Sequence, residues 1–277
     1  MPTDPAPAAH ALARLMEVMR RLRDPVDGCP WDLRQSHGSI APYTIEEAYE
    51  AEEAIERGDV LDLRDELGDL LLQVVFQAQI GHEAGDFTFA DIADAIADKM
   101  IRRHPHIFET GGDPAAGPVE WEAIKAAERQ AKRQTGDDAP DSAIAGVAAT
   151  LPPLSRALKL QKRAARIGFD FPDWRDALAK THEELLEVVK AAPTGPDETE
   201  AEVGDLLFAA INLARKLDVD PDVALKQANR KFETRFRAME QRLRDQGCNP
   251  ATASLEAQDA AWDQAKRDAR IAKDRKP

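Results

Sequence analysis

The stretch that decides the fold contains Glu46-Glu47-Ala48-Tyr49-Glu50, followed by Glu66-Leu67-Gly68-Asp69. Both motifs stand in segments with helical periodicity, and residues three or four apart in a helix share a face. Glu47 and Glu50 should therefore point together, as should Glu66 and Asp69. The midpoint between the two pairs is Gly58, within the turn-like Arg57-Gly58-Asp59. The pattern predicts an antiparallel helical hairpin that brings four carboxylates to one level.

The same arrangement occurs again in the second half of the chain. Glu183-Glu184-x-x-Glu187 is followed by Glu202-Val203-Gly204-Asp205, and the midpoint falls between Thr194 and Gly195 in a Pro- and Gly-containing turn. The sequence therefore predicts two hairpins, each with four carboxylates.

Four carboxylates at one level repel one another. A pair of like charges 4 Å apart costs about 1 kcal/mol in water and about 4 kcal/mol at an effective dielectric of 20. A solvated acidic face is the usual interpretation of a single Glu-x-x-Glu, but its recurrence beside apolar stripes in both halves favours a metal site. Oxygen ligands suit Mg²⁺ or Mn²⁺. A di-iron bundle is not expected, because the chain contains no Glu-x-x-His.

Bulk properties exclude several classes of protein. The 277 residues include 37 Lys and Arg against 51 Asp and Glu, a net charge of −14, which argues against general nucleic-acid binding. The two cysteines, Cys29 and Cys248, form no disulfide framework. No signal peptide is visible and no apolar run approaches the length of a membrane helix. We therefore expect a cytoplasmic protein that binds neither membranes nor nucleic acids.

Helical periodicity dominates, and strand-like alternation is nearly absent. A segment rich in Gly, Asp, Ala and Pro, residues 134–150, is typical of a linker. We therefore predict an all-α protein with tandem helical-bundle domains, residues 10–133 and 151–270.

The repeat extends beyond the carboxylates. A basic pair and a Trp/Lys pair, each one helical turn apart, occur in the same order in both halves at offsets of 132 to 141 residues. Beside a bound metal, the basic pair would complete a phosphate site, although alone it suits a solvent-facing surface. The tryptophan could stack on a base or close the core, and periodicity leaves both possibilities open. The matched pairs are Lys99 and Arg103 with Lys231 and Arg235, and Trp121 and Lys125 with Trp262 and Lys266.

Several longer motifs share one family's pattern. They are Cys29-Pro-Trp-Asp32, Tyr43-Thr-Ile-Glu-Glu-Ala-Tyr49, Asp65-Glu-Leu-Gly-Asp-Leu-Leu-Leu-Gln-Val-Val-Phe76, Arg102-Arg-His-Pro-His-Ile-Phe108, Gln161-Lys-Arg-Ala-Ala165, Gly168-Phe-Asp170, Glu202-Val-Gly-Asp-Leu-Leu-Phe208 and Lys231-Phe-Glu-Thr-Arg-Phe236. Together they resemble the MazG family of nucleoside triphosphate pyrophosphohydrolases, over nearly the whole chain. The resemblance implies dimeric all-α bundles that use Mg²⁺ to hydrolyse nucleoside triphosphates to monophosphate and pyrophosphate.

The resemblance also implies roles for individual residues. Glu183 is an added carboxylate that would orient the attacking water. The metal ligands implied in the second half are Glu184, Glu187, Glu202 and Asp205, and the candidates at the matching positions of the first half are Glu47, Glu50, Glu66 and Asp69. The implied nucleotide contacts are Lys180, Lys231, Arg235, Trp262 and Lys266.

We therefore expect a metal-activated water to attack the α-phosphorus, with Glu183 and Glu184 as candidates for the general base. The second half should carry most of the hydrolysis. The resemblance indicates the second half. In addition, Lys180 precedes the acidic motif of the second half, whereas the corresponding stretch of the first half, Ala41-Pro-Tyr-Thr44, contains no basic side chain. Apolar hairpin faces predict a homodimer. Two alternatives stay open: a dUTP or phosphoribosyl-ATP pyrophosphatase of the same fold, and a non-enzymatic nucleotide-sensing or protein-binding bundle.

Overall fold

The computed structural model describes residues 5–108 and 142–274. The chain divides into two compact units, Met1–Gly136 and Asp137–Pro277. The division falls within the segment expected to be a linker, residues 134–150, whose described part contains turns and no helix. Each unit is described by itself below.

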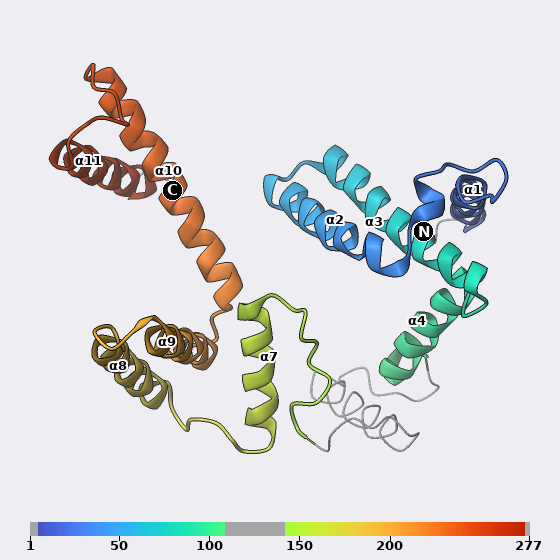
Figure 1. The fold of residues 1–277 in the computed structure, drawn as a ribbon, viewed down its shortest axis with the longest axis horizontal. Coiled ribbons are helices and arrows are strands. Elements are labelled where there is room, and N and C mark those ends of the chain that lie inside the picture. Colours follow the sequence, from blue (N-terminus) through green and yellow to red (C-terminus); the bar gives the residue numbers. More distant parts are fainter. Residues whose placement is uncertain (1–4, 109–141, 275–277) are drawn as a thin grey trace. The chain divides into compact units, whose positions relative to one another are not determined.

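Both units consist of helices joined by turns, and the described residues contain no strand, which confirms the predicted all-α class. The first unit contains α1 (Ala6–Leu22), the 3₁₀ helix η1 (Asp32–Arg34), α2 (His37–Arg57), α3 (Val60–Ala84), α4 (Phe89–Arg103) and α5 (Pro105–Phe108). The second contains α7 (Pro153–Arg166), α8 (Trp174–Ala191), α9 (Pro196–Lys216), α10 (Pro221–Asp245) and α11 (Leu255–Asp274). In each unit two neighbouring helices form an antiparallel hairpin, α2 with α3 and α8 with α9 (Figure 1).

The turn of the first hairpin lies at the predicted place. Gly58 ends α2 in the left-handed conformation, with φ of 69°, which glycine adopts at little steric cost. The Asp59 carboxylate then caps α3 by accepting hydrogen bonds from the backbone N–H groups of Leu61 and Asp62, at 3.2 and 3.1 Å. The hairpin is therefore specified locally, by the residues at its turn.

The second hairpin turns through residues 192–195. The hydroxyls of Thr194 and Thr199 donate to the carbonyl oxygen of Ala191, at 2.7 and 3.3 Å, and so satisfy the end of α8. Pro196 then begins α9, where its missing N–H has no cost. A different set of turn residues therefore produces the same hairpin.

The buried cores of the two units are small. In the first unit, α1 packs against α3 around five buried residues: Met19, Ile40, Val75, Phe76 and Ile80. In the second unit one cluster joins α7 to α9, and a separate cluster joins the C-terminal half of α10 to α11. The α10–α11 pair therefore has its own core.

The hairpins leave much of their apolar surface uncovered within a unit. On α8, Leu186 is 60% exposed and Val189 is 64% exposed, and on α9 Leu207 is 56% exposed. On α3, Leu67 is 50% exposed. None of the helices in the described ranges combines the length and hydropathy needed to cross a membrane.

Candidate metal centre and nucleotide contacts

Three of the four predicted carboxylates of the first hairpin meet. Glu47 on α2 and Glu66 and Asp69 on α3 each offer a carboxylate oxygen, and these oxygens lie within 4.8 Å of one another. Burial raises the pKa of Glu47, and the charges of Asp69, Glu50 and Glu66 raise it further. The pKa of Glu66 is raised for the same reasons, first burial and then the charge of Glu50. The repulsion expected from the sequence is therefore present in the folded hairpin.

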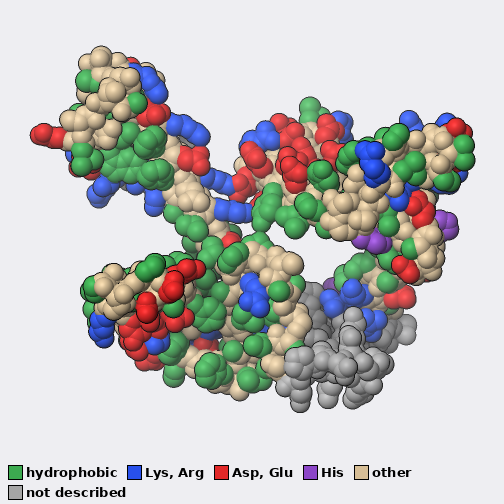
Figure 2. All heavy atoms as spheres, in the orientation of Figure 1, with side chains coloured by type: hydrophobic (Ala, Val, Ile, Leu, Met, Phe, Trp, Pro, Cys, Tyr) green, Lys and Arg blue, Asp and Glu red, His purple; other side chains and the backbone are tan. Residues whose placement is uncertain are grey.

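The second hairpin forms a matching group. Carboxylate oxygens of Glu184, Glu187 and Glu202 lie within 4.8 Å of one another, and Glu184 is only 5% exposed. Figure 2 shows acidic side chains gathered over α2–α3 and over α8–α9. Such a set of converging carboxylate oxygens can hold a hard divalent cation.

The two hairpins differ in how their charges are balanced. Nζ of Lys180 lies 2.8 Å from Glu183 and 2.7 Å from Glu184, so one ammonium pairs with both carboxylates. The hydrogen bond from Lys180 lowers the pKa of Glu184, whereas a hydrogen bond shared with Glu184 and burial raise the pKa of Glu187. The position of Lys180 corresponds to Tyr43 in the first hairpin, which offers no such charge.

Glu50 and Asp205 do not join the close groups. Both are exposed, and neither belongs to the sets whose oxygens converge within 4.8 Å. Glu50 still contributes through its charge, which raises the pKa values of Glu47 and Glu66. The structure therefore brings together three of the four predicted carboxylates in each unit.

The predicted basic and aromatic contacts lie on other helices. Lys231 and Arg235 are on α10, Trp262 and Lys266 are on α11, and α11 packs along the C-terminal half of α10 (Figure 1). Among the described residues, none of these four side chains forms an ion pair or hydrogen bond with the carboxylate group. Lys266 instead pairs with Asp263 at 3.5 Å.

The sequence left open whether Trp262 closes the core or offers a surface for a base, and the structure is compatible with both roles. It packs against the buried cluster of Met239, Leu243 and Ala261, and it also lines a cavity of about 490 Å³ between α10 and α11. Two further aromatic rings, absent from the predicted site, line the same cavity. Phe232 lies 5.3 Å from Trp262 and 5.7 Å from Phe236, measured between ring centroids. The spacing of these two phenylalanines, one helical turn apart beside Lys231 and Arg235, was the sequence signal for them.

The first unit differs at these positions. Lys99 and Arg103 lie on α4, whereas Trp121 and Lys125 fall outside the described residues.

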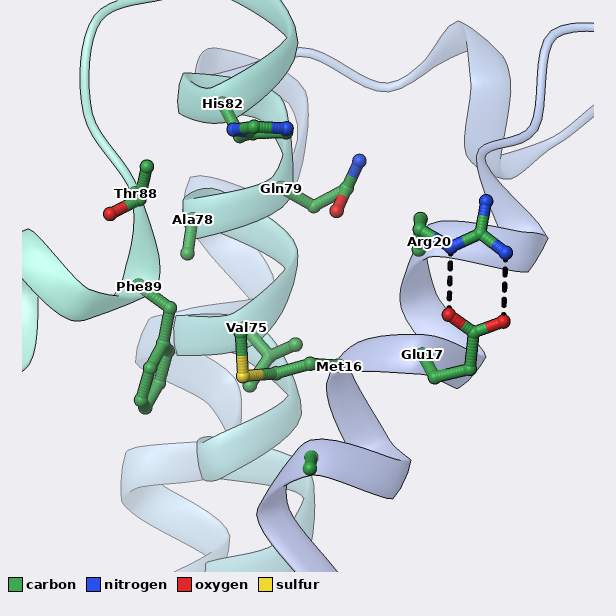
Figure 3. Close-up of a pocket in the computed structure, with 10 residues that line it drawn as sticks. Met16, Glu17, Arg20, Val75, Ala78, Gln79, His82, Thr88 and Phe89 are labelled. Carbon is green, nitrogen blue, oxygen red and sulfur yellow. Dashed lines mark hydrogen bonds and ion pairs between the residues drawn. The ribbon is translucent and has the colours of Figure 1, made fainter.

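The first unit also contains an apolar cavity of about 420 Å³ between α1 and α3. Met16, Val75 and Phe89 line it, and the ion pair of Glu17 and Arg20 stands beside it (Figure 3). None of the predicted site residues lines this cavity.

Comparisons with known proteins identify the family to which the chain belongs. Residues 35–108 match the family model described as "MazG nucleotide pyrophosphohydrolase domain". The nucleoside triphosphate pyrophosphohydrolase of Escherichia coli (strain K12) is 46% identical over 263 residues, which cover 93% of this chain and 98% of that protein.

Two further relatives are similar over most of this chain. The nucleoside triphosphate pyrophosphohydrolase/pyrophosphatase MazG of Thermotoga maritima is 42% identical over 91% of this chain and 94% of its own length. The uncharacterized protein YabN of Bacillus subtilis is 41% identical over 93% of this chain and 52% of its own length. The chain therefore belongs to the MazG family of nucleotide pyrophosphohydrolases.

Proposed function

We propose that this protein hydrolyses nucleoside triphosphates to nucleoside monophosphate and pyrophosphate with the help of Mg²⁺. The observation that carries this proposal is the group formed by Glu184, Glu187 and Glu202, whose oxygens converge in a chain that is 46% identical to a nucleoside triphosphate pyrophosphohydrolase. Mn²⁺, which also accepts oxygen ligands, should substitute for Mg²⁺.

The carboxylate groups fit a hard divalent cation. All their donors are oxygens, and burial together with the charges of neighbouring carboxylates raises the pKa of Glu47. In the second unit Glu184, Glu187 and Glu202 would hold the ion, with Asp205 completing the set from the edge. In the first unit Glu47, Glu66 and Asp69 would hold it, with Glu50 at the edge. When bound, Mg²⁺ neutralises phosphate charge and lowers the pKa of its water.

The chain's own residues would then position the substrate. Lys231 and Arg235 are suited to binding phosphate oxygens and stabilising the charge that develops on them. The rings of Trp262, Phe232 and Phe236 offer a surface on which a base can stack. Lys266, one turn after Trp262, can reach a phosphate. A water oxygen would bond to the α-phosphorus while the bond to the bridging oxygen breaks and pyrophosphate leaves.

Glu183 and Glu184 remain the two candidates for accepting the water's proton. Both are paired with Lys180, and the hydrogen bond from Lys180 lowers the pKa of Glu184, which favours the ionised carboxylate that a base must present. Glu183 is exposed, whereas Glu184 is buried within the carboxylate group. We assign Glu183 to orienting the water and Glu184 to the metal and the proton.

We further propose that the protein acts as a homodimer in the cytoplasm, with two MazG-like domains at about residues 10–133 and 151–270. The exposed apolar side chains of α8 and α9, among them Leu186 and Leu207, would be covered by a second copy. Cys29 and Cys248 are both free thiols, which suits a reducing compartment.

Pyrophosphate release from a panel of ribo- and deoxyribonucleoside triphosphates, with and without Mg²⁺, tests the proposal. Release from several substrates that stops in Glu202→Gln but persists in Glu200→Gln, an exposed acid two residues away, would support it. Turnover of dUTP or phosphoribosyl-ATP alone would replace it with the narrower activity. No release from any substrate would favour a binding or sensing role.

A further inference from the structure

The apolar cavity of the first unit lies on the face of α3 that points away from the carboxylates. Val75 lines it and follows Glu66 by nine residues, about two and a half helical turns, so these two side chains leave α3 on opposite faces. Ala78 and His82 continue the Val75 face. The facing wall belongs to α1, which precedes the family-matched residues 35–108. The cavity is therefore separate from the candidate metal centre.

The walls of the cavity are apolar. Val75 and Ala78 are buried, at 2% and 3% exposed, and Met16 of α1 and Phe89 of α4 line the sides. Figure 3 shows the Met16 side chain reaching from α1 to Val75. The volume of about 420 Å³ falls within the range of small-molecule sites, roughly 300–1,000 Å³. Because apolar cavities are poorly hydrated and take up small aromatic molecules, the cavity suits a ligand with an apolar ring.

Two polar side chains at the cavity keep hydrogen-bonding capacity in reserve. Arg20 donates from Nε and Nη2 to Glu17, at 2.7 and 2.8 Å, which leaves Nη1 without a hydrogen bond among the described residues. Gln79 donates from Nε2 to Glu83 at 3.0 Å, which leaves its acceptor, Oε1, without one in the same part of the chain. Figure 3 shows the Gln79 amide pointing toward Arg20. One donor from α1 and one acceptor from α3 are therefore available to a ligand.

The charges around the cavity are balanced. Glu17 neutralises Arg20, and Arg23 neutralises Glu83 at 2.6 Å. An ion entering an apolar cavity without a partner of opposite charge pays a large desolvation cost, so an uncharged polar head is favoured over a carboxylate or an ammonium. An apolar side chain inserted by another protein would cover the Arg20 donor and the Gln79 acceptor without satisfying either. A small molecule with a hydroxyl head satisfies both.

We infer that this cavity binds a small uncharged aromatic molecule. Its ring packs between Met16, Val75 and Phe89, and its hydroxyl accepts a hydrogen bond from Arg20 and donates one to Gln79. The bound molecule holds α1 against α3 and thereby stabilises the first unit. This site goes beyond the proposed function, because it uses none of the proposed metal ligands or nucleotide contacts.

Hydrogen exchange of the full chain, titrated with 4-methylphenol and followed by mass spectrometry, tests this inference. The compound should slow exchange in α1 and α3, and the concentration that gives half of this effect measures its affinity. Toluene, which lacks the hydroxyl, should bind about 2- to 10-fold more weakly, as expected for the loss of one hydrogen bond. Gln79→Leu should lower the affinity for 4-methylphenol to that for toluene and leave the affinity for toluene unchanged.

A filled cavity provides the matched control. Ala13→Phe, on α1 and at the cavity wall, should weaken both compounds by about 10-fold or more, since the added ring occupies the space that the ligand needs. Ala11→Phe should leave both affinities unchanged, because Ala11 is an exposed α1 residue that does not line the cavity. Circular dichroism confirms that each variant folds.

Three results would overturn the inference: no protection of α1 and α3 by 4-methylphenol, protection that persists in Ala13→Phe, or equal affinities of wild type for the two compounds. Loss of a dimer in Ala13→Phe, measured by light scattering, would show that a second copy fills the cavity and would overturn it as well. Pyrophosphate release is measured on the same samples. Its absence from wild type would overturn the proposed hydrolysis and leave the cavity site standing.

Discussion

Replacing Glu83 by glutamine should loosen the first unit, because Glu83 balances the buried guanidinium of Arg23. Nε of Arg23 lies 2.9 Å from Oε1 of Glu83 and Nη2 lies 2.6 Å from Oε2. The Arg23 side chain is 6% exposed and also stands over the Phe76 ring, 5.4 Å from its centroid. Glu83→Gln keeps the size of the side chain and removes only its charge.

The magnitude follows from the burial of the two partners. Removing one member of a fully buried ion pair costs about 3–5 kcal/mol. The Glu83 side chain is 34% exposed, so solvent screening reduces the expected loss to about 1–3 kcal/mol. Because 1.4 kcal/mol is a factor of ten, backbone amides of α1 and α3 should exchange hydrogen about 5- to 150-fold faster.

The effect should also depend on pH. The hydrogen bond from Arg23 lowers the pKa of Glu83 below its ordinary value of 4.5. A carboxyl with a lowered folded-state pKa adds stability above the unfolded-state pKa, and that stability is lost as pH falls through the folded-state pKa. Wild type should therefore lose its advantage over Glu83→Gln as the pH falls below about 4.

Hydrogen exchange measured by mass spectrometry on the full chain gives the exchange rates of α1 and α3 separately from those of the second unit. Glu17→Gln is the matched control, because Glu17 forms a similar two-armed pair with Arg20, at 2.7 and 2.8 Å, on the exposed surface. It should leave exchange almost unchanged. Equal exchange in Glu83→Gln and wild type at neutral pH would show that the Arg23 charge is balanced in another way and would refute the reasoning.

Further predictions concern the two hairpins and their metal. Glu184→Ala or Asp205→Ala should remove most pyrophosphate release, whereas Glu47→Ala or Asp69→Ala should leave a substantial fraction; equal losses in folded variants would make both units catalytic. EDTA should abolish release reversibly, and Mg²⁺ at 100 times its Kd should raise the unfolding free energy by about 2.7 kcal/mol; full turnover in excess EDTA would rule the mechanism out. Hydrolysis in ¹⁸O-water should label the nucleoside monophosphate, and label in pyrophosphate would move the attack to the β-phosphorus.

The hairpins could be predicted from the sequence because their signals are local. The Glu-x-x-Glu and Glu-x-x-Asp spacings identify helix faces, and Gly58 marks the turn between them. The same spacings could not show that Glu50 and Asp205 stand apart from the close groups. That outcome depends on how each helix is rotated against its neighbour, which is decided by packing across the hairpin and is not contained in a three-residue spacing.

The side chains that join different segments were harder to predict. The approach of Trp31 to Tyr43 depends on the path of the η1 loop, which Arg23 fixes through contacts with distant residues. The ring of Phe232 against Trp262 likewise depends on the packing of α10 with α11. Helical periodicity identified the candidates on each helix, but only the tertiary structure shows which of them meet.

The ammonium of Lys180 acts as an internal counterion for the second hairpin. Its contacts with Glu183 and Glu184 mean that the buried Glu184 already has a positive neighbour before any ion arrives. A divalent cation held by Glu184 would compete with this ammonium for the same carboxylate. A lysine displaced in this way would be available to pair with a phosphate oxygen. Within residues 5–108 and 142–274, no lysine or arginine is paired with Glu47, Glu66 or Asp69 of the first hairpin, so a cation would meet no such competitor among these residues.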